Sequence, residues 1–385
     1  MALRMFAKST TITEATRPIA REELQSARIE QPADTWPAEW HPQSGVMLTW
    51  PHAHTDWAPM LRQVEACYLQ MAYHIASQEQ LLVVTPEPGR IETLLRQHLP
   101  ERLMANVSLV CCESDDTWAR DHGPLCVLEG GLWTVKDFGF NAWGGKFPFE
   151  KDNAITARVF QNGTWHANYQ DCTDFILEGG SVESDGRGTI LTTAQCLLNP
   201  NRNPRLSAAD IEERLLRELH ARRVLWLHHG HMDGDDTDAH IDTLARLCPA
   251  DTIAYVQCTD PDDGHYDDLQ HMEAELRNLR TLEDRPYRLL PLPLPAPVYD
   301  EDDGTRLPAT YANFLVLNGS VLVPTYAQPE LDRTACETIQ KAFPTHQVVG
   351  IDCRPLIRQH GSLHCCTMQF PAGVLREDDE LAEAK

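Results

Sequence analysis

Polar residues that could carry out chemistry gather in four short segments of the sequence. Each segment combines carboxylates, histidines or a cysteine with glycines. The segments are DDTWARDHGP at 115–124, LEGGSVESDGRG at 177–188, HHGHMDGDDTDAHID at 228–242 and HGSLHCCTMQ at 360–369. Side chains of these types serve as nucleophiles, as proton donors and acceptors, or as metal ligands.

The histidine-rich third segment allows two interpretations. Its four histidines and five aspartates could bind the metal of a metal-dependent amidohydrolase. The spacing, however, fits neither H-E-x-x-H nor an EF-hand, because Asp238 stands where an EF-hand loop beginning at Asp233 needs glycine. A solvated polar loop is the alternative, and it would account for His228, His229 and Asp235.

The end of that segment, HID at 240–242, has a spacing of its own. In a strand, alternation would place His240 and Asp242 on one face, with Ile241 on the other. A histidine beside a carboxylate suits a general base next to an acid that binds a cation. A buried histidine with an ordinary structural role is the alternative.

A pair of cysteines in the fourth segment offers a nucleophile. Cys365 and Cys366 lie in a run with strand character, so their side chains would point to opposite faces and only one could enter a common site. A thiol becomes nucleophilic when nearby positive charge lowers its pKa. That charge would come from a protonated histidine or from a cationic substrate. A buried, inert thiol is the alternative for either residue.

The composition excludes several classes of protein. With 33 basic and 57 acidic side chains the formal net charge is −24, which repels nucleic acids and anionic membranes and attracts small cations. No apolar run reaches the roughly 18 residues of a membrane span, and the N-terminal segment is too polar for a secretory signal. Twelve scattered cysteines without a C-x-x-C pair are typical of buried thiols in a reducing compartment. We therefore expect a globular, cytoplasmic protein.

Helical and strand-like segments alternate along the chain. Each amphipathic segment is followed by a short apolar run. The amphipathic segments are 58–78, 90–99, 207–220, 267–283 and 331–343, and the apolar runs are 81–85, 107–112, 224–227, 287–292 and 346–352. Ser207, three residues before Asp210, predicts a helix N-terminus. The repetition favours one α/β domain built from similar units.

Predicted hairpins separate these units. FILEGGSV and GTILTT would be joined across residues 185–188, and NFLVL and SVLVPTY across Asn318-Gly319. Such antiparallel pairs argue against a purely parallel, doubly wound sheet. We predict an N-terminal extension over residues 1–35, a single domain over 36–372 and a charged tail over 373–385.

In combination, the motifs resemble those of the agmatine deiminases, which belong to the guanidino-group-modifying, peptidylarginine deiminase-like proteins. The resemblance covers roughly residues 30–371, with the motifs in the same order. The matching blocks are WPAEWHPQSGVMLTWPHxxTDW, DDTWARDHGP, FNAWGGK, LEGG followed by LTTxxCLLNPNRNP, TDAHID, TYANFLVLNGSVLVPTY and GSLHC. The resemblance implies a pentein-type α/β propeller, in which five pseudo-symmetric ββαβ units surround a central funnel.

The resemblance also implies catalytic roles. Cys365 of G-x-x-H-C would be the nucleophile, and His240 of H-x-D would be the general acid and base. Asp121 of W-x-R-D and Asp242 would hold the guanidinium nitrogens. Glu178 of L-E-G-G would orient His240 or the substrate.

Substrate contacts and the reaction follow from the same resemblance. Trp118 and Gly361 would line the substrate channel together with Asp121 and Asp242. Agmatine would be hydrolysed to N-carbamoylputrescine, on the route to putrescine and polyamines, and ammonia through a covalent S-alkylthiouronium. No metal or organic cofactor would take part. The GSLHC block departs from the G-N-I-H-C form of plant-type members, which leaves the contacts of the amine end open.

Other functions remain open at this point. Peptidyl-arginine deimination is the nearest alternative, and free arginine is a weaker one. A metal-dependent amidohydrolase would use the His/Asp cluster, whereas a non-catalytic pentein-fold binding protein should lack the complete set of thiol, histidine and acids. The partners expected are a small cationic substrate and a second copy of the chain in a homodimer.

Overall fold

One arrangement of strands and helix is repeated five times in the computed structural model, which describes residues 34–376. Two antiparallel strands are followed by a helix and by a third strand, which is parallel to the second. This is the predicted pentein-type arrangement of five ββαβ units. Residues 1–33 of the predicted extension and 377–385 of the predicted tail lie outside the described part, so the domain boundaries stay a prediction.

Four of the units are continuous in sequence. The second contains β4 (Leu125–Glu129), β5 (Leu132–Gly139), α6 (Ile155–Gln161) and β6 (Asn168–Ile176), and the third β7 (Val182–Ser184), β8 (Thr189–Thr193), α8 (Ala208–Glu218) and β9 (Arg223–Leu227). The fourth contains β10 (Ala245–Cys248), β11 (Thr252–Gln257), α9 (Tyr266–Asn278) and β12 (Arg288–Pro293), and the fifth β15 (Leu315–Val316), β16 (Ser320–Thr325), α10 (Pro329–Ala342) and β17 (Gln347–Asp352). A two-stranded ribbon, β13 (Val298–Tyr299) and β14 (Arg306–Leu307), lies between the last two units in sequence.

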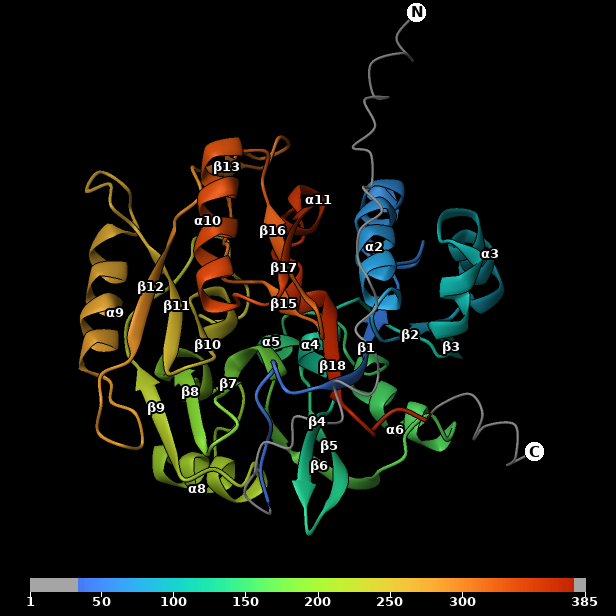
Figure 1. The fold of residues 1–385 in the computed structure, drawn as a ribbon, viewed down its shortest axis with the longest axis horizontal. Helices are drawn as coiled ribbons and strands as arrows, with labels where there is room; N and C mark the ends of the chain where they lie inside the picture. Colours follow the sequence, from blue (N-terminus) through green and yellow to red (C-terminus); the bar gives the residue numbers. More distant parts are fainter. Residues whose placement is uncertain (1–33, 377–385) are drawn as a thin grey trace, which may run out of the picture.

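The first unit is assembled from both ends of the described chain. Strand β18 (Thr367–Pro371) pairs antiparallel with β1 (Gln43–Thr49), and β1 pairs parallel with β2 (Gln80–Thr85) after α2 (Leu61–Ala76). Helix α3 (Pro88–His98) and β3 (Val107–Cys111) extend this sheet. Figure 1 shows β1 and β18 side by side near the centre of the view. The pairing therefore joins the last unit of the chain to the first.

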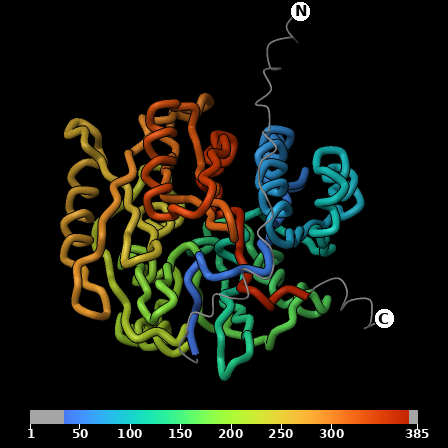
Figure 2. The backbone as a smooth tube through the Cα atoms, in the orientation of Figure 1, coloured from blue at the N-terminus to red at the C-terminus, as the bar shows by residue number. Residues whose placement is uncertain are grey.

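The helices lie on the outside of this arrangement, as α2, α8, α9 and α10 show in Figure 1 and as the tube in Figure 2 traces. The inner strands of the sheets, such as β1, β2, β8, β11 and β16, are buried on both faces along most of their length, whereas the outer strands β6 and β17 carry exposed residues. In β1, Val46 and Leu48 belong to one hydrophobic cluster and Met47 belongs to another, because successive side chains of a strand point to opposite faces. Continuous apolar runs such as LLVV in β2 are what strands buried on both faces require.

Several local predictions are confirmed. Ser207 caps α8 in a capping box with Asp210, and the buried side chains of Ile211 and Leu215 lie one turn apart on this helix. The two predicted hairpins are present as β7–β8 and β15–β16. The predicted helix–strand pairs also form, with boundaries that differ by a few residues.

Three strand predictions are wrong. Residues 240–242 form the start of a 3₁₀ turn, η5 (Ile241–Thr243), and Cys365 and Cys366 lie in another, η6 (His364–Cys366). FILEGGSV is not one strand, because β6 ends at Ile176 and η4 (Gly179–Ser181) separates it from β7. Turns this short have too few residues for a helical period to be visible in a sequence.

Two further observations concern composition. Within residues 34–376, no helix combines the length and the apolar character that crossing a bilayer requires. All twelve cysteines lie in the described part, and all are free thiols.

Candidate active site

Five turns, one from each unit, meet at the centre of the molecule. Each turn immediately precedes the first strand of its unit, and each contributes a polar side chain. The turns are α4 (Ala119–His122) with Asp121, η4 with Glu178 at its N-cap, η5 with His240 and Asp242, the segment before β15 with Asn313, and η6 with Cys365. The repeated fold thus places predicted site residues that are far apart in sequence around one point.

Gly180 marks that point. A Cβ atom added to this glycine would lie 2.7 Å from His240 Nδ1, 2.8 Å from Asp121 Oδ1 and 3.1 Å from Asp242 Oδ2. Only glycine leaves the space in which these three groups approach each other. The second glycine of the L-E-G-G motif is therefore explained by close packing at the site.

Cys365 is buried, and its position is fixed by Asn313. The thiol donates to Asn313 Oδ1 at 3.4 Å, and the same oxygen accepts from the backbone N–H of His364 at 2.8 Å. Burial, together with the nearby carboxylates of Asp242 and Asp121, raises the pKa of Cys365 well above its usual value. A further positive charge beside the thiol would lower this pKa. Cys366 is buried elsewhere, against Tyr68 and Cys67.

Asp121 is held by N–H donors on both carboxylate oxygens. Gly180 donates its backbone N–H to Oδ1 and Trp143 donates its indole N–H to Oδ2, each at 3.0 Å. Trp143 has φ 55°, a left-handed conformation that is rare for a bulky residue and typical of strained functional positions. Burial raises the pKa of Asp121 to about 6, although the His240 imidazole, 3.6 Å away, opposes the shift.

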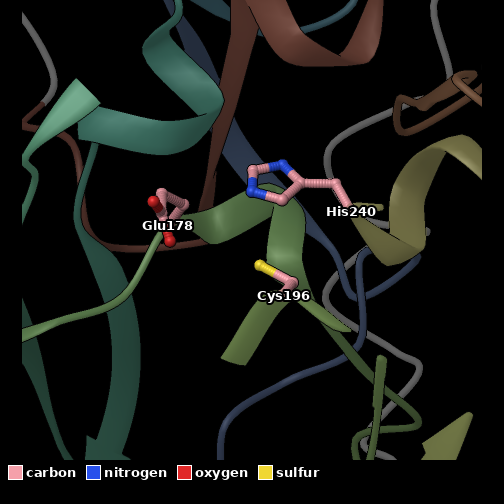
Figure 3. A group of neighbouring side chains, drawn as sticks. All are labelled: Glu178, Cys196 and His240. Carbon is pink, nitrogen blue, oxygen red and sulfur yellow. The ribbon is translucent and has the colours of Figure 1, made fainter. Parts of the chain in front are cut away.

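His240 is completely buried, and its surroundings favour the charged form. Burial by itself would lower the pKa of His240, but Asp121, Cys196 and Glu178 raise it to about 10. Figure 3 shows the ring nitrogen farther from the backbone directed toward the side chains of Glu178 and Cys196. Atoms of these three residues lie within 4.8 Å of one another. The imidazolium can therefore serve as a proton donor.

Glu178, which lies beside His240, forms a buried ion pair with Arg202. Arg202 donates its Nε–H to both carboxylate oxygens of Glu178, at 3.0 Å each, and donates from Nη1 to Asp238 at 2.7 Å. Glu178 and Arg202 are both fully buried. The buried guanidinium of Arg202 comes from the LNPNRNP segment, which also carries Asn201.

Asp242 is bound on one oxygen only. Its Oδ2 accepts from His364 Nδ1 at 2.7 Å, whereas Oδ1 is buried and has no hydrogen-bond partner among residues 34–376. Burial would raise the pKa of Asp242, but the bond and the charge of His364 lower it. Asp242 is thus an ionised carboxylate with a free oxygen in the site.

A pocket of about 110 Å³ leads to Cys365 from the surface. Asp121, Trp118 and Gly361 also line it, whereas His240, Glu178 and Asp242 are fully buried and are not among its lining residues. The other lining residues are Asp56, Asp116, Trp143, Phe147, Asp236, Thr237, Gln359 and His360. The lining therefore includes four aspartates and neither lysine nor arginine.

Trp118 forms one wall of this pocket in a fixed orientation. Its indole N–H donates to Asp116 Oδ2 at 2.8 Å, and Trp57 donates to Asp116 Oδ1 at 3.0 Å. Burial raises the pKa of Asp116 to about 6.

Two groups of side chains within residues 34–376 are close enough to share a metal ion. They are Glu178, Cys196 and His240, and Glu39, Glu183 and His364. In both groups the carboxylates are bound by a buried guanidinium, from Arg202 and Arg246 respectively. Guanidinium groups that already use these oxygens disfavour a second cation there.

The histidine-rich segment does not form a shared cluster with His240. His229 contacts Glu275 and His231 contacts Asp268, each at 2.8 Å. Asp235 is not simply solvated as the loop interpretation had it, because its carboxylate accepts from the backbone N–H groups of Thr237 and Ala239. Asp235 therefore shapes the turn that carries His240 into the site.

No separate feature of the sequence pointed to Asn313, Arg202, Cys196 or Trp143. All four lie inside the blocks quoted above, in TYANF, LNPNRNP, LTTxxC and FNAWGGK. These four residues contact partners that are distant in sequence. Only their place inside the family blocks indicated that they belong to the site.

Comparison with known proteins gives a consistent result. Residues 35–371 match the family described as Porphyromonas-type peptidyl-arginine deiminase. An agmatine deiminase of Pseudomonas aeruginosa is 34% identical over 359 residues, which is 87% of this chain and 95% of that protein.

Solved structures are also similar. A Porphyromonas gingivalis protein provisionally named arginine deiminase has 49% sequence identity and a TM-score of 0.84, covering 89% of this chain and 100% of that one. An agmatine deiminase of C. jejuni, with a cysteine replaced by serine and substrate bound, has 37% identity and a TM-score of 0.81, covering 89% and 97%.

Proposed function

The chain belongs to the Porphyromonas-type peptidyl-arginine deiminase family, and we propose that it is the family's agmatine-hydrolysing kind, releasing ammonia and N-carbamoylputrescine. The observation that carries this proposal is the convergence of Asp121, His240 and Asp242 beside Gly180, with Cys365 on the adjoining pocket wall. Two carboxylates, an imidazolium and a thiol are the groups that hydrolysis of a guanidinium requires.

The two carboxylates would bind the guanidinium. A free guanidinium is a poor electrophile because its charge is delocalised over three nitrogens. Asp121 and the free Oδ1 of Asp242 can accept hydrogen bonds from two of these nitrogens, which fixes the group and makes its carbon more electrophilic. The positive charge of the substrate also stabilises the thiolate, so Cys365 loses its proton to solvent as the substrate binds.

Cys365 then attacks the guanidinium carbon and forms a tetrahedral adduct. His240 donates its proton to the departing nitrogen, so that ammonia leaves and an S-alkylthiouronium remains. The neutral imidazole next takes a proton from water, and the hydroxide attacks the same carbon. Collapse of this second adduct breaks the C–S bond, and the proton of its hydroxyl group passes to the departing sulfur, which releases the ureido product, the Cys365 thiol and the imidazolium.

The pocket lining favours agmatine over free arginine. Agmatine ends in an amine, which four aspartates in the lining can attract. Arginine carries a carboxylate, and its usual partner would be a lysine or arginine, neither of which lines this pocket. The agmatine deiminases among the similar proteins support the same choice.

A direct assay tests the proposal. The purified protein is incubated with agmatine, arginine or a peptide ending in arginine, and ureido product is measured with and without EDTA. We expect chelator-insensitive product from agmatine. Product mainly from the peptide would instead identify a peptidyl-arginine deiminase, and loss of activity with EDTA would refute the cysteine mechanism.

We also propose that the protein is a cytoplasmic homodimer. Twelve free thiols fit a reducing compartment, and the family resemblance suggests the dimer. Light scattering should give twice the chain mass, and a monomer mass would refute the second proposal.

A further inference from the structure

His364, the residue before the proposed nucleophile, lies between two buried carboxylates. Its Nδ1 is 2.7 Å from Asp242 Oδ2, and its Nε2 is 2.7 Å from Glu39 Oε2. The side chains of His364 and Asp242 are almost completely buried, and that of Glu39 is 9% exposed. Glu39 and His364, from opposite ends of the described chain, thus form one line of hydrogen bonds with Asp242, which lies in the site.

His364 has a carboxylate oxygen close to each ring nitrogen. Glu39 Oε2 also accepts from Arg246 Nη2 at 2.7 Å, and its Oε1 accepts from the backbone N–H of Val316 at 2.8 Å. Arg246 Nη2 lies 3.1 Å from His364 Nε2 as well. Within residues 34–376, Asp242 Oδ2 is the one hydrogen-bond partner of Nδ1, and an ionised carboxylate oxygen only accepts, so Nδ1 carries the proton of this hydrogen bond.

Two buried guanidinium groups lie beside Glu39. Arg246 contacts both Glu39 and Glu183, and Arg120 Nη2 lies 3.9 Å from Glu39. Glu39 is therefore a fixed partner for His364 Nε2, as Asp242 is for Nδ1.

The hydrogen bond from His364 decides which oxygen of Asp242 is free. With Oδ2 occupied, the buried and unpartnered Oδ1 is left for a ligand. We propose that Glu39 and His364 are a positioning pair, which holds Asp242 in one orientation and keeps it ionised for binding the guanidinium. Neither residue touches the reacting atoms. This inference rests on the proposed deiminase function only for its kinetic consequence.

The first experiment requires no activity. The protein is labelled with ¹⁵N-histidine, and the His364 signals are assigned by their loss in His364→Asn. Nδ1 should carry a proton in the spectrum, because it donates to Asp242 Oδ2. A His364 ring that is protonated only on Nε2 would overturn the proposal, whether or not the protein hydrolyses agmatine.

The second experiment uses a matched pair of variants. Glu39→Gln and Glu183→Gln each remove one buried carboxylate bound to Arg246, but only Glu39 contacts His364. In Glu39→Gln the carboxylate that faces Nε2 is lost, so His364 holds Asp242 less firmly. We expect KM for agmatine to rise about tenfold while kcat changes less than about threefold, because binding of the guanidinium is weakened.

Glu183→Gln should leave KM for agmatine within about twofold of the wild-type value, even if kcat falls. An equal rise of KM in both variants, or no rise in a folded Glu39→Gln, would overturn the proposal. Near-UV circular dichroism shows whether each variant is folded. If Glu39→Gln does not fold, the ¹⁵N-histidine spectrum of the first experiment tests the proposal instead. If the wild-type protein does not hydrolyse agmatine, the proposed function fails, and the spectrum still tests the positioning pair separately.

Discussion

The indole ring of Trp118 lies directly against the backbone of Gly361. A Cβ atom at position 361 would lie 2.2 Å from Cζ3 and 2.5 Å from Cη2 of that ring. Asp116 holds the indole N–H, so the ring cannot rotate away without breaking a hydrogen bond. The glycine of G-x-x-H-C is therefore required by contact with the opposite wall of the pocket.

This contact predicts the effect of Gly361→Ala. The added methyl group should displace Trp118 and raise KM for agmatine about tenfold or more, while the protein stays folded, because the wall of the pocket moves. Gly89→Ala is the matched control, since a Cβ atom there meets nothing within 4 Å. Steady-state kinetics check the prediction, and an unchanged KM for Gly361→Ala would contradict it.

The two adjacent cysteines should differ sharply. Cys365→Ala removes the thiol that lines the pocket, so turnover should fall to background. Cys366→Ala removes a thiol buried away from the pocket, at a cost of roughly 1–2 kcal/mol in stability, and should keep most of the activity. Ureido product formation measures both, and an equal loss in the two variants would remove Cys365 from its proposed role.

Arg202 is expected to contribute far more to stability than a surface arginine. Arg202→Ala leaves the buried Glu178 unpaired, which should lower the free energy of unfolding by about 3–5 kcal/mol. Arg333→Ala breaks the exposed contacts with Glu330 and Glu337 and should cost less than about 1 kcal/mol. Urea unfolding compares the two, and similar losses would show that the buried pair is not structurally important.

The activity should have an alkaline optimum. Asp121 must be ionised to bind a cation, so kcat/KM should fall as pH drops through its pKa of about 6. His240 must be protonated to release ammonia, so the rate should fall as pH rises through its pKa of about 10. A pH profile with agmatine measures both limbs. An optimum below pH 6 would contradict this assignment.

Sequence reasoning identified the helices and strands that carry a local signal, such as a cap or a regular apolar pattern. The Ser207–Asp210 capping box and the apolar strand runs are local signals, and the structure contains both. HID at 240–242 was wrong as a strand because a three-residue 3₁₀ turn has no such signal. His240 and Asp242 still reach one site, since the turn bends both side chains toward Gly180.

The partners of the site residues could not be predicted in the same way. Glu178 and Arg202 form an ion pair across 24 positions of sequence, and Glu39 and His364 meet across 325. Such contacts depend on how the units pack, which no local pattern records.

The pairing of β18 with β1 also has a consequence for synthesis. A ribosome makes β1 before, and β18 after, every other strand of the described residues, and the proposed nucleophile leaves the exit tunnel just ahead of the strand that completes the first sheet. A nascent chain that carries every other side chain of the site is therefore catalytically silent. Activity begins only when the C-terminal strand finds its place beside the N-terminal one.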